Sequence, residues 1–137
     1  MNTTLSPLSQ ILSKFNIDLS QVKRIVFVSS IAGSMASAPI LSLIIPISVD
    51  ELRTIIEGNI EGKEVLNYIG HAPTVSLLNK LLNLNLQPTR AEYRISPNDL
   101  IIMVSLSQRQ IVSGQDVLVS DFSQLVIRIV KVIQVIS

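Results

Sequence analysis

The stretch KRIVFVSSIAGSMASAPILSLIIPI, Lys23 to Ile47, decides the fold. After its two basic residues it carries no charge, and that pattern resembles a membrane-spanning helix with a basic flank. Pro39 and Pro46 argue against such a helix, because proline removes a backbone donor and breaks helical structure. The apolar residues also fall into two clusters, separated by small and polar residues. We therefore predict two buried strands, Lys23 to Val28 and Ile40 to Ile47, joined by a loop.

Helical patterns lie on both sides of this stretch. The expected helices cover Met1 to Val22, Val49 to Glu57, Lys63 to Ile69 and Pro73 to Asn83. The first would be an N-terminal extension of the domain. Ser48 and Glu51 have the spacing of a capping box, which predicts the start of the second helix. Gly70 is expected to end the third in a left-handed conformation, and Pro73 fits the first turn of the fourth.

Beyond Pro88 the pattern changes to strands. The expected strands are Arg90 to Ile95, Leu100 to Leu106 and Leu125 to Ile136, with a short strand or turn at Asp116 to Val119. A turn at Ser96 to Asp99 would join the first two. Because strands and helices interleave, we predict one α/β domain over residues 23–137, with a mixed sheet of about five strands flanked by helices.

Composition narrows the possible functions. The chain has 137 residues, a net charge of +1, no cysteine and a single histidine. Without cysteine there can be no disulfide framework or thiolate metal site, and one histidine excludes a site built from several. The scattered Lys and Arg residues do not form the basic stripe that coats DNA. We therefore expect no metal, no cofactor, no DNA partner and no membrane partner. A small anionic ligand stays possible.

His71 is the first candidate for chemistry. It lies just before a predicted helix start, where backbone N–H groups attract anions. The imidazole of His71 could donate a proton to the leaving oxygen of a phosphate held there. The alternative interpretation is that His71 is simply a polar residue at a helix end.

Arg109 and a set of serines are the further candidates. Arg109 follows a hydrophobic strand, and Ser105, Ser107 and Arg109 alternate so that they would share one face. Arginine beside hydroxyl groups suits a phosphate, although a solvated charge at a strand end explains it equally. In the first loop, Ser29, Ser30 and Ser34 could donate to phosphates or bases. No Walker loop, GxSxG elbow or dinucleotide fingerprint is present.

Three sequence blocks resemble the archaeal-virus ring nucleases, a family that degrades cyclic tetra-adenylate and so acts as a type III anti-CRISPR. The blocks are NYIGHAPTVSLLNKLLN (67–83), RAEYRI (90–95) and NDLIIMVSLSQR (98–109). They are similar to the family's "IGH…T…LIN", "R-x-E" and "D-x-L…S-Q-R" patterns. Upstream, KRIVFVSSIAGSM occupies the place of the family's first strand and ligand loop. The likeness covers about residues 23–136.

The resemblance implies a homodimer in the cytoplasm of an infected host cell that closes over cyclic tetra-adenylate, with one site per subunit. A 2′-hydroxyl of the RNA attacks the neighbouring phosphate without a metal. By the resemblance, His71 is the general acid and Arg109 stabilises the phosphate charge. Thr74 and the backbone N–H groups at its helix start cradle the same phosphate.

Several positions depart from the family pattern. Ser113 stands before Gly114 where members commonly have a glutamate, and the loop RQIVSG has one extra residue. Ser29 and Ser34 stand at asparagine positions, and Ser105 where glutamine is usual. A second hypothesis is therefore a catalytically weakened protein that sequesters the cyclic nucleotide. A third is a structural or membrane-associated viral protein that uses the apolar stretch.

Overall fold

The computed structural model describes residues 7–107, 111–112, 115–116 and 122–136. Its centre is a five-stranded sheet in the order β2-β7-β4-β1-β3. The strands are β1 (Arg24–Val28), β2 (Ile40–Ile47), β3 (Glu64–Asn67), β4 (Asp99–Leu106) and β7 (Leu125–Val135). A separate pair joins β5 (Ile111–Val112) to β6 (Gln115–Asp116). The predicted α/β class with a mixed five-stranded sheet is confirmed.

The strand directions determine which residues meet at one edge of the sheet. β1 runs parallel to both of its neighbours, β3 and β4, and β7 runs antiparallel to β4 and β2. The carboxyl ends of β1, β3 and β4 therefore lie at the same edge. Pro46, which cannot donate to a strand ladder, lies in β2 at the margin of the sheet, where proline is tolerated.

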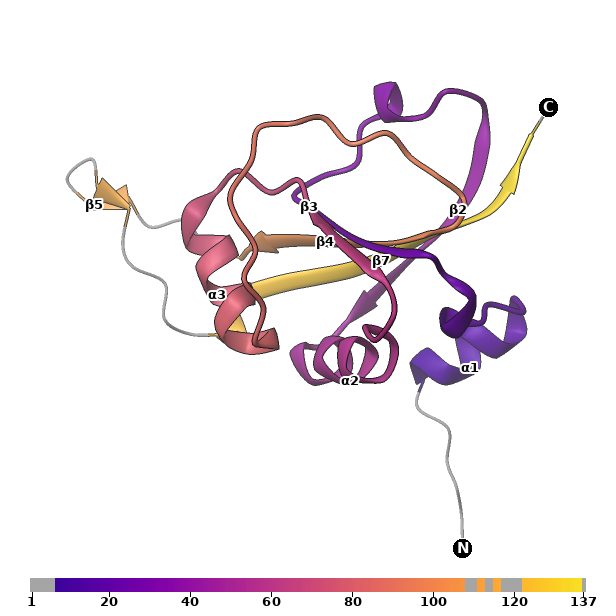
Figure 1. Ribbon diagram of the computed structural model, residues 1–137, viewed down its shortest axis with the longest axis horizontal. Coiled ribbons are helices and arrows are strands. Elements are labelled where there is room, and N and C mark those ends of the chain that lie inside the picture. The colour runs from indigo at the N-terminus through magenta and orange to yellow at the C-terminus, as the bar shows by residue number, and fades with distance from the viewer. Residues whose placement is uncertain (1–6, 108–110, 113–114, 117–121, 137) are drawn as a thin grey trace, which may run out of the picture.

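Helices cover one face of the sheet, and irregular segments of the chain cover the other (Figure 1). One face carries the helices α1 (Pro7–Lys14), α2 (Val49–Asn59) and α3 (Ala72–Leu82), and the larger apolar core lies beneath them. The opposite face is covered by the segments 29–39 and 84–98, whose Met35, Tyr93 and Ile95 pack on a smaller core. Short 3-10 turns lie at η1 (Leu19–Gln21), η2 (Gly33–Met35) and η3 (Phe122–Gln124).

The start of α2 follows from the sequence. Ser48 Oγ accepts a hydrogen bond from the Glu51 backbone N–H at 3.1 Å, and a Glu51 carboxylate oxygen accepts one from the Ser48 N–H at 2.9 Å. This reciprocal pair is the predicted capping box, which satisfies two N–H groups that a helix start leaves unpaired. The helix extends two residues beyond the predicted end, to Asn59.

The N-terminal helix is shorter than predicted and is tied to the domain. Within the expected Met1 to Val22, α1 covers Pro7–Lys14, and residues 1–6 lie outside the described part. Leu8 is buried in the larger core. Lys63 Nζ donates to three backbone carbonyls in the segment after α1, at Leu19, Ser20 and Val22. These contacts hold the extension against the body of the protein.

The predicted helix from Lys63 to Ile69 is wrong. Residues 64–67 form β3, which pairs in parallel with β1 and places Glu64 beside Arg24. The two apolar side chains of this strand point to opposite faces of the sheet, since Val65 packs on the larger core and Leu66 on the smaller one. Among the described glycines the positive φ belongs to Gly62, at 77°, so the left-handed end expected at Gly70 is also wrong.

The predicted strand from Arg90 to Ile95 is also wrong, because segment 84–98 forms no ladder. It begins under the helices, where Leu86 joins the larger core, and passes to the opposite face, where Tyr93 is buried. The alternation of inward residues was real, but they pack onto the sheet face from an irregular chain. The Ser96–Asp99 turn is confirmed, with Asp99 N–H donating to the Ser96 carbonyl at 3.2 Å.

The remaining predicted strands are confirmed. β1, β2, β4 and β7 match the expected ranges within two residues at each end. Of the expected short element at Asp116–Val119, Asp116 lies in β6 and residues 117–119 lie outside the described part. The uncharged stretch is thus two strands and a loop. Within the described residues, no helix has both the length and the apolar character needed to cross a membrane.

Candidate active site at the carboxyl edge of the parallel strands

The chain leaves β1 and β3 in opposite directions at the same edge of the sheet. After β1, the segment 29–39 passes to the face without helices, whereas after β3 the chain passes to α3 on the helical face (Figure 1). Phe27 and Asn67 are register partners, so the two exits are adjacent. Ligands of α/β proteins bind at such a divergence, outside the carboxyl ends of the strands. His71 lies here.

His71 is the N-cap residue of α3, as predicted from its position before the helix. Its ring is half-buried, and its Nδ1 lies 2.8 Å from Thr74 Oγ1. Thr74 is only 3% exposed, so this hydroxyl is fixed by its surroundings. The predicted contact of Thr74 with a phosphate is not tested by this arrangement. Its observed contact is with the imidazole, which it orients.

The other ring nitrogen of His71 has no partner among the residues that the structure describes. Nε2 is shielded from solvent and makes no hydrogen bond to any of the described residues. A buried polar atom without a partner costs about 1–3 kcal/mol. Native proteins keep few such atoms, and catalytic groups are prominent among them. The site therefore holds one ring nitrogen firmly and leaves the other available for a further group.

The backbone before His71 is held by segment 84–98. Asn67 Nδ2 donates to the carbonyls of Ile69 and Gln87, and Asn67 Oδ1 accepts from the Ile69 N–H. The Thr89 N–H donates to the Ile69 carbonyl. A side chain at Gly70 would place its Cβ 3.0 Å from the Thr89 carbonyl oxygen, so glycine permits this close approach. The position of His71 thus depends on a segment more than ten residues away.

A shallow groove begins next to His71 on α3. It has a volume of about 410 Å³ and runs from Ala72 past Ser76 to Lys80, with Leu86, Gln87 and Pro88 on the facing segment. The groove places the Ser76 hydroxyl between one and two turns, and the Lys80 ammonium group between two and three turns, along α3 from His71.

The predicted serines lie on other segments of the chain than the His71–Thr74 pair. Ser29 and Ser30 are exposed directly after β1, and Ser34 is exposed in η2. Ser105 points away from Val104 and Leu106, which pack on the larger core, so it lies on the face without helices. Ser107 follows β4 and is exposed, and its N–H donates to the Gln124 carbonyl. Their roles as ligand contacts stay predictions. Arg109 and Ser113 lie outside the described residues.

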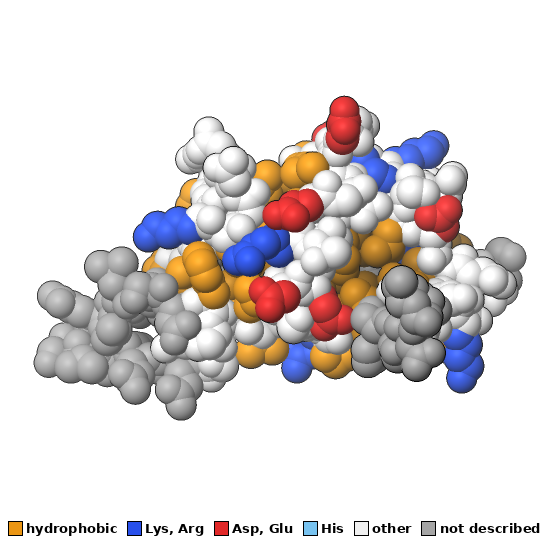
Figure 2. Space-filling view, turned by 90° about the horizontal axis from the view of Figure 1, so that it is seen from below, with side chains coloured by type: hydrophobic (Ala, Val, Ile, Leu, Met, Phe, Trp, Pro, Cys, Tyr) orange, Lys and Arg blue, Asp and Glu red, His pale blue; other side chains and the backbone are white. Residues whose placement is uncertain are grey.

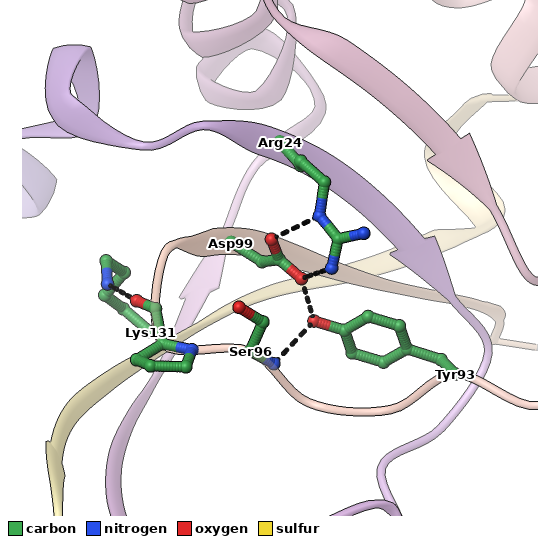
Figure 3. Close-up of polar contacts among 6 residues, drawn as sticks. Arg24, Tyr93, Ser96, Asp99 and Lys131 are labelled. Carbon is green, nitrogen blue, oxygen red and sulfur yellow. Dashed lines mark hydrogen bonds and ion pairs between the residues drawn. The ribbon is translucent and has the colours of Figure 1, made fainter.

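A buried polar cluster at the opposite edge of the sheet was not predicted from the sequence (Figure 3). Asp99 is fully buried and receives two hydrogen bonds from the Arg24 guanidinium, at 2.8 and 2.6 Å. Tyr93 Oη donates to the same carboxylate. The Ser96 N–H donates to Tyr93 Oη, and Lys131 Nζ donates to the Pro97 carbonyl. Arg24 and Asp99 begin two strands that are parallel partners, and this pairing, which no local sequence pattern reveals, brings them together.

This cluster shifts the proton equilibria of its members. Burial, and then the hydrogen bond to Asp99, raise the pKa of Tyr93 well above its ordinary value of 10.0. The hydrogen bond to Asp99 also raises the pKa of Arg24. Burial lowers the pKa of Lys131 from 10.5. Arg24 and Tyr93 both donate hydrogen bonds to the Asp99 carboxylate. The cluster therefore holds residues 93–99 against the start of β1.

On the helical face, Lys and Arg are interspersed with Asp and Glu and form no continuous basic stripe (Figure 2). Among the residues described, no group of three or more His, Cys, Asp or Glu side chains is placed to hold a metal ion.

Comparison with known proteins gives the chain a family. A family model described as STIV B116-like matches residues 25–125. Among solved structures, the chain is similar to B116 of Sulfolobus turreted icosahedral virus, with a TM-score of 0.62 and 21% sequence identity. That similarity covers 80% of this chain and 98% of the viral one, and it shows a shared fold. No protein with curated annotation matches. Since the family model spans most of the sequence, the chain belongs to the STIV B116-like family.

Proposed function

We propose that the protein is a metal-independent ring nuclease that binds and cleaves cyclic tetra-adenylate, and so antagonises type III CRISPR signalling in the cytoplasm of an infected host cell. The observation that carries the proposal is the His71 imidazole, with Nδ1 on Thr74 and a buried Nε2 that lacks a partner in the described part of the chain. The identity of the ligand, cyclic tetra-adenylate, is inferred from the resemblance of residues 67–109 to ring nucleases. The B116-like fold agrees with an archaeal-virus origin.

The reaction needs one proton donor at the leaving group. The ribose 2′-oxygen forms a bond to the adjacent phosphorus, the bond from phosphorus to the 5′-oxygen breaks, and the 2′ proton passes to solvent. In the proposal, His71 Nε2 delivers a proton to the departing 5′-oxygen. The products are linear adenylates with a 2′,3′-cyclic phosphate at one end and a 5′-hydroxyl at the other.

Thr74 has a positioning role in this mechanism. In this step Nδ1 keeps its proton while Nε2 gives one up, so the Thr74 hydroxyl accepts a hydrogen bond from Nδ1–H in both states. The same 2.8 Å contact therefore serves the ring before and after proton transfer. The proposal also requires the groups that shield Nε2 to move when cyclic tetra-adenylate binds, because that nitrogen is shielded from solvent in the free protein.

Phosphate binding would use the start of α3. The first N–H groups of the helix and the partial positive charge there favour an anion close to His71. Arg109 would stabilise the charge that develops on the phosphate. Six serines would contact the rest of the cyclic tetra-adenylate: Ser29, Ser30, Ser34, Ser105, Ser107 and Ser113. We propose a homodimer with one such site per subunit.

Product analysis tests this function. The purified protein is incubated with labelled cyclic tetra-adenylate in EDTA, and the products are separated and treated with a phosphatase. Linear products that resist phosphatase until their cyclic phosphate is opened by acid support the proposal. Intact ligand with tight binding supports the sequestering hypothesis, which the Ser113 substitution motivates. Intact ligand without binding contradicts both.

A further inference from the structure

An aromatic side chain lies three residues before His71, at the carboxyl edge of the parallel strands. Tyr68 directly follows β3, and its N–H donates to the Phe27 carbonyl of β1 at 2.8 Å. The side chain of Tyr68 packs on the smaller core, so it lies on the face of the sheet without helices. His71 lies across the divergence, at the start of α3. Three residues span at most about 11 Å, so one ligand in the divergence can reach both side chains.

The ring of Tyr68 is supported by a neighbour but is not fully covered. Tyr93 packs against it, with 5.2 Å between the ring centroids and 49° between the ring planes. Tyr93 is itself buried, and its hydroxyl donates to Asp99, so this support is fixed. Tyr68 is only half-buried. The fold thus leaves part of a firmly supported aromatic ring accessible beside the candidate site.

The backbone around Tyr68 is held by the residue before it. The Asn67 side chain bridges Tyr68, because its Oδ1 accepts from the Ile69 N–H at 3.0 Å. Its Nδ2 donates to the carbonyls of Ile69 and Gln87. The same contacts hold the backbone that leads to His71, so one network places the tyrosine and the imidazole. A ring that is placed in advance loses little entropy when a ligand stacks on it.

We propose that Tyr68 stacks on an adenine base of cyclic tetra-adenylate, next to the phosphate that lies at His71. This role rests on the proposed function and adds to it the group that binds a base. Aromatic side chains are common platforms for the bases of single-stranded RNA, since every base presents a π-face. The bases of a cyclic tetranucleotide have no complementary strand, so they are free to stack on the protein.

The other aromatic side chains are unsuited to this role. The chain has three phenylalanines, two tyrosines and no tryptophan. Phe27 and Tyr93 are buried. Phe122 packs against the larger core, on the helical face. Phe15 is 43% exposed, but it lines a pocket with the end of β7, at the opposite edge of the sheet. Tyr68 is therefore the aromatic residue that the fold offers to a base at this site.

Two substitutions at Tyr68 separate stacking from other roles. Tyr68→Leu keeps an apolar side chain against the smaller core but removes the π-face, whereas Tyr68→Phe keeps the ring and removes the hydroxyl. Rapid mixing with labelled cyclic tetra-adenylate gives the affinity of each protein before cleavage. Tyr68→Leu is expected to bind about 5- to 150-fold more weakly, the range for loss of one stacked base. Tyr68→Phe should bind nearly as tightly as the unmodified protein. Phe15→Leu, the matched control at the far edge, should show no change.

Two further measurements exclude a merely structural effect. The single-turnover rate at saturating protein should be the same for Tyr68→Leu and the unmodified protein, because the base is remote from the bond that breaks. Damage to the fold would lower this rate as well. Because the chain has no tryptophan, its emission comes from its two tyrosines. Stacking should quench the emission of the unmodified protein, whereas Tyr68→Phe, which retains only Tyr93, should show no such quenching.

Three results would overturn the role of Tyr68 while leaving the proposed function intact. The first is equal affinity of Tyr68→Leu and the unmodified protein. The second is an equal loss of affinity in Tyr68→Phe and Tyr68→Leu, which would assign the effect to the hydroxyl. The third is equal quenching in the unmodified protein and Tyr68→Phe, and it decides the matter even if Tyr68→Leu does not fold. An unmodified protein that binds no cyclic tetra-adenylate would instead contradict the proposed function and the role of Tyr68 together.

Discussion

At the scale of single residues, the contact between His71 and Thr74 explains how one imidazole can be both fixed and reactive. The Nδ1–Oγ1 contact of 2.8 Å anchors the ring at the N-cap of α3, and the buried Nε2 stays without a partner among the described residues. The sequence pointed to His71 because Gly70 is typical of a helix end and Pro73 of the first turn of the next helix, so His71 lies at a helix start. It could not find the Thr74 contact, which depends on the rotamers of two side chains one turn apart.

Replacing Thr74 separates a positioning role from ligand binding. Loss of one hydrogen bond worth about 1–1.5 kcal/mol predicts that Thr74→Val cleaves the ring roughly tenfold more slowly. Thr74→Ser keeps the hydroxyl and should restore most of the rate. Single-turnover cleavage and a binding titration check this. A binding constant that weakens tenfold, with an unchanged rate at saturation, would instead assign Thr74 to the ligand.

Tyr93 is predicted to stabilise the fold through Asp99. Tyr93→Phe removes the hydroxyl that donates to the buried carboxylate and leaves the ring packing in place. A hydrogen bond to a charged group contributes about 1.5–3 kcal/mol, so the free energy of unfolding should fall by that order. Urea denaturation measures it. A loss below about 0.5 kcal/mol would show that Arg24 alone satisfies Asp99.

The same tyrosine predicts an alkaline limit of stability. The pKa of Tyr93 in the folded protein is raised above its ordinary value of 10.0, so the neutral phenol is favoured by the fold. Its contribution is therefore complete below pH 10 and declines as the pH rises further. Lys131 acts in the opposite direction, because its pKa is lowered by burial. Thermal unfolding between pH 9 and 11 should show a steeper decline for the unmodified protein than for Tyr93→Phe. Equal declines would contradict this role of Tyr93.

At the scale of elements, the approach of α3 to segment 84–98 depends on a glycine. Gly70→Ala places a Cβ 3.0 Å from the Thr89 carbonyl oxygen, and backbone must shift to admit it. Overpacking of this kind costs about 1–3 kcal/mol. Gly58→Ala is the matched control, since it lies within α2 with no atom within 4 Å of the added Cβ. It should instead stabilise by about 0.5–1 kcal/mol. Melting temperatures that move in the same direction for both variants would contradict the close approach.

The elements also show where sequence patterns are sufficient. The strands β1 and β2 were predictable because prolines divide an uncharged apolar stretch, and α2 was predictable from its capping box. β3 was missed because Val65 and Leu66 are too few residues to display alternation. The pattern of residues 90–95 predicts a strand because Tyr93 and Ile95 do face inward; only the three-dimensional arrangement shows that they pack on a sheet face.

At the scale of the whole molecule, the sheet order brings together residues that the sequence separates. Arg24 and Asp99 are 75 positions apart and meet because β1 and β4 are parallel partners. The exits of β1 and β3 form a divergence at which Ser29 and His71 leave the sheet, and local periodicity does not reveal that order. The sequence did locate His71 at its helix start, whereas its surroundings required the fold.

The most direct test of the account is the single-turnover rate of cyclic tetra-adenylate cleavage in EDTA, measured for the unmodified protein and for His71→Ala at saturating protein. Loss of a general acid typically lowers a rate by about 10²–10⁴-fold. We predict a decrease within this range, with the ligand still bound by His71→Ala. Equal rates for the two proteins would contradict the assignment of His71 and, with it, the central claim about this site.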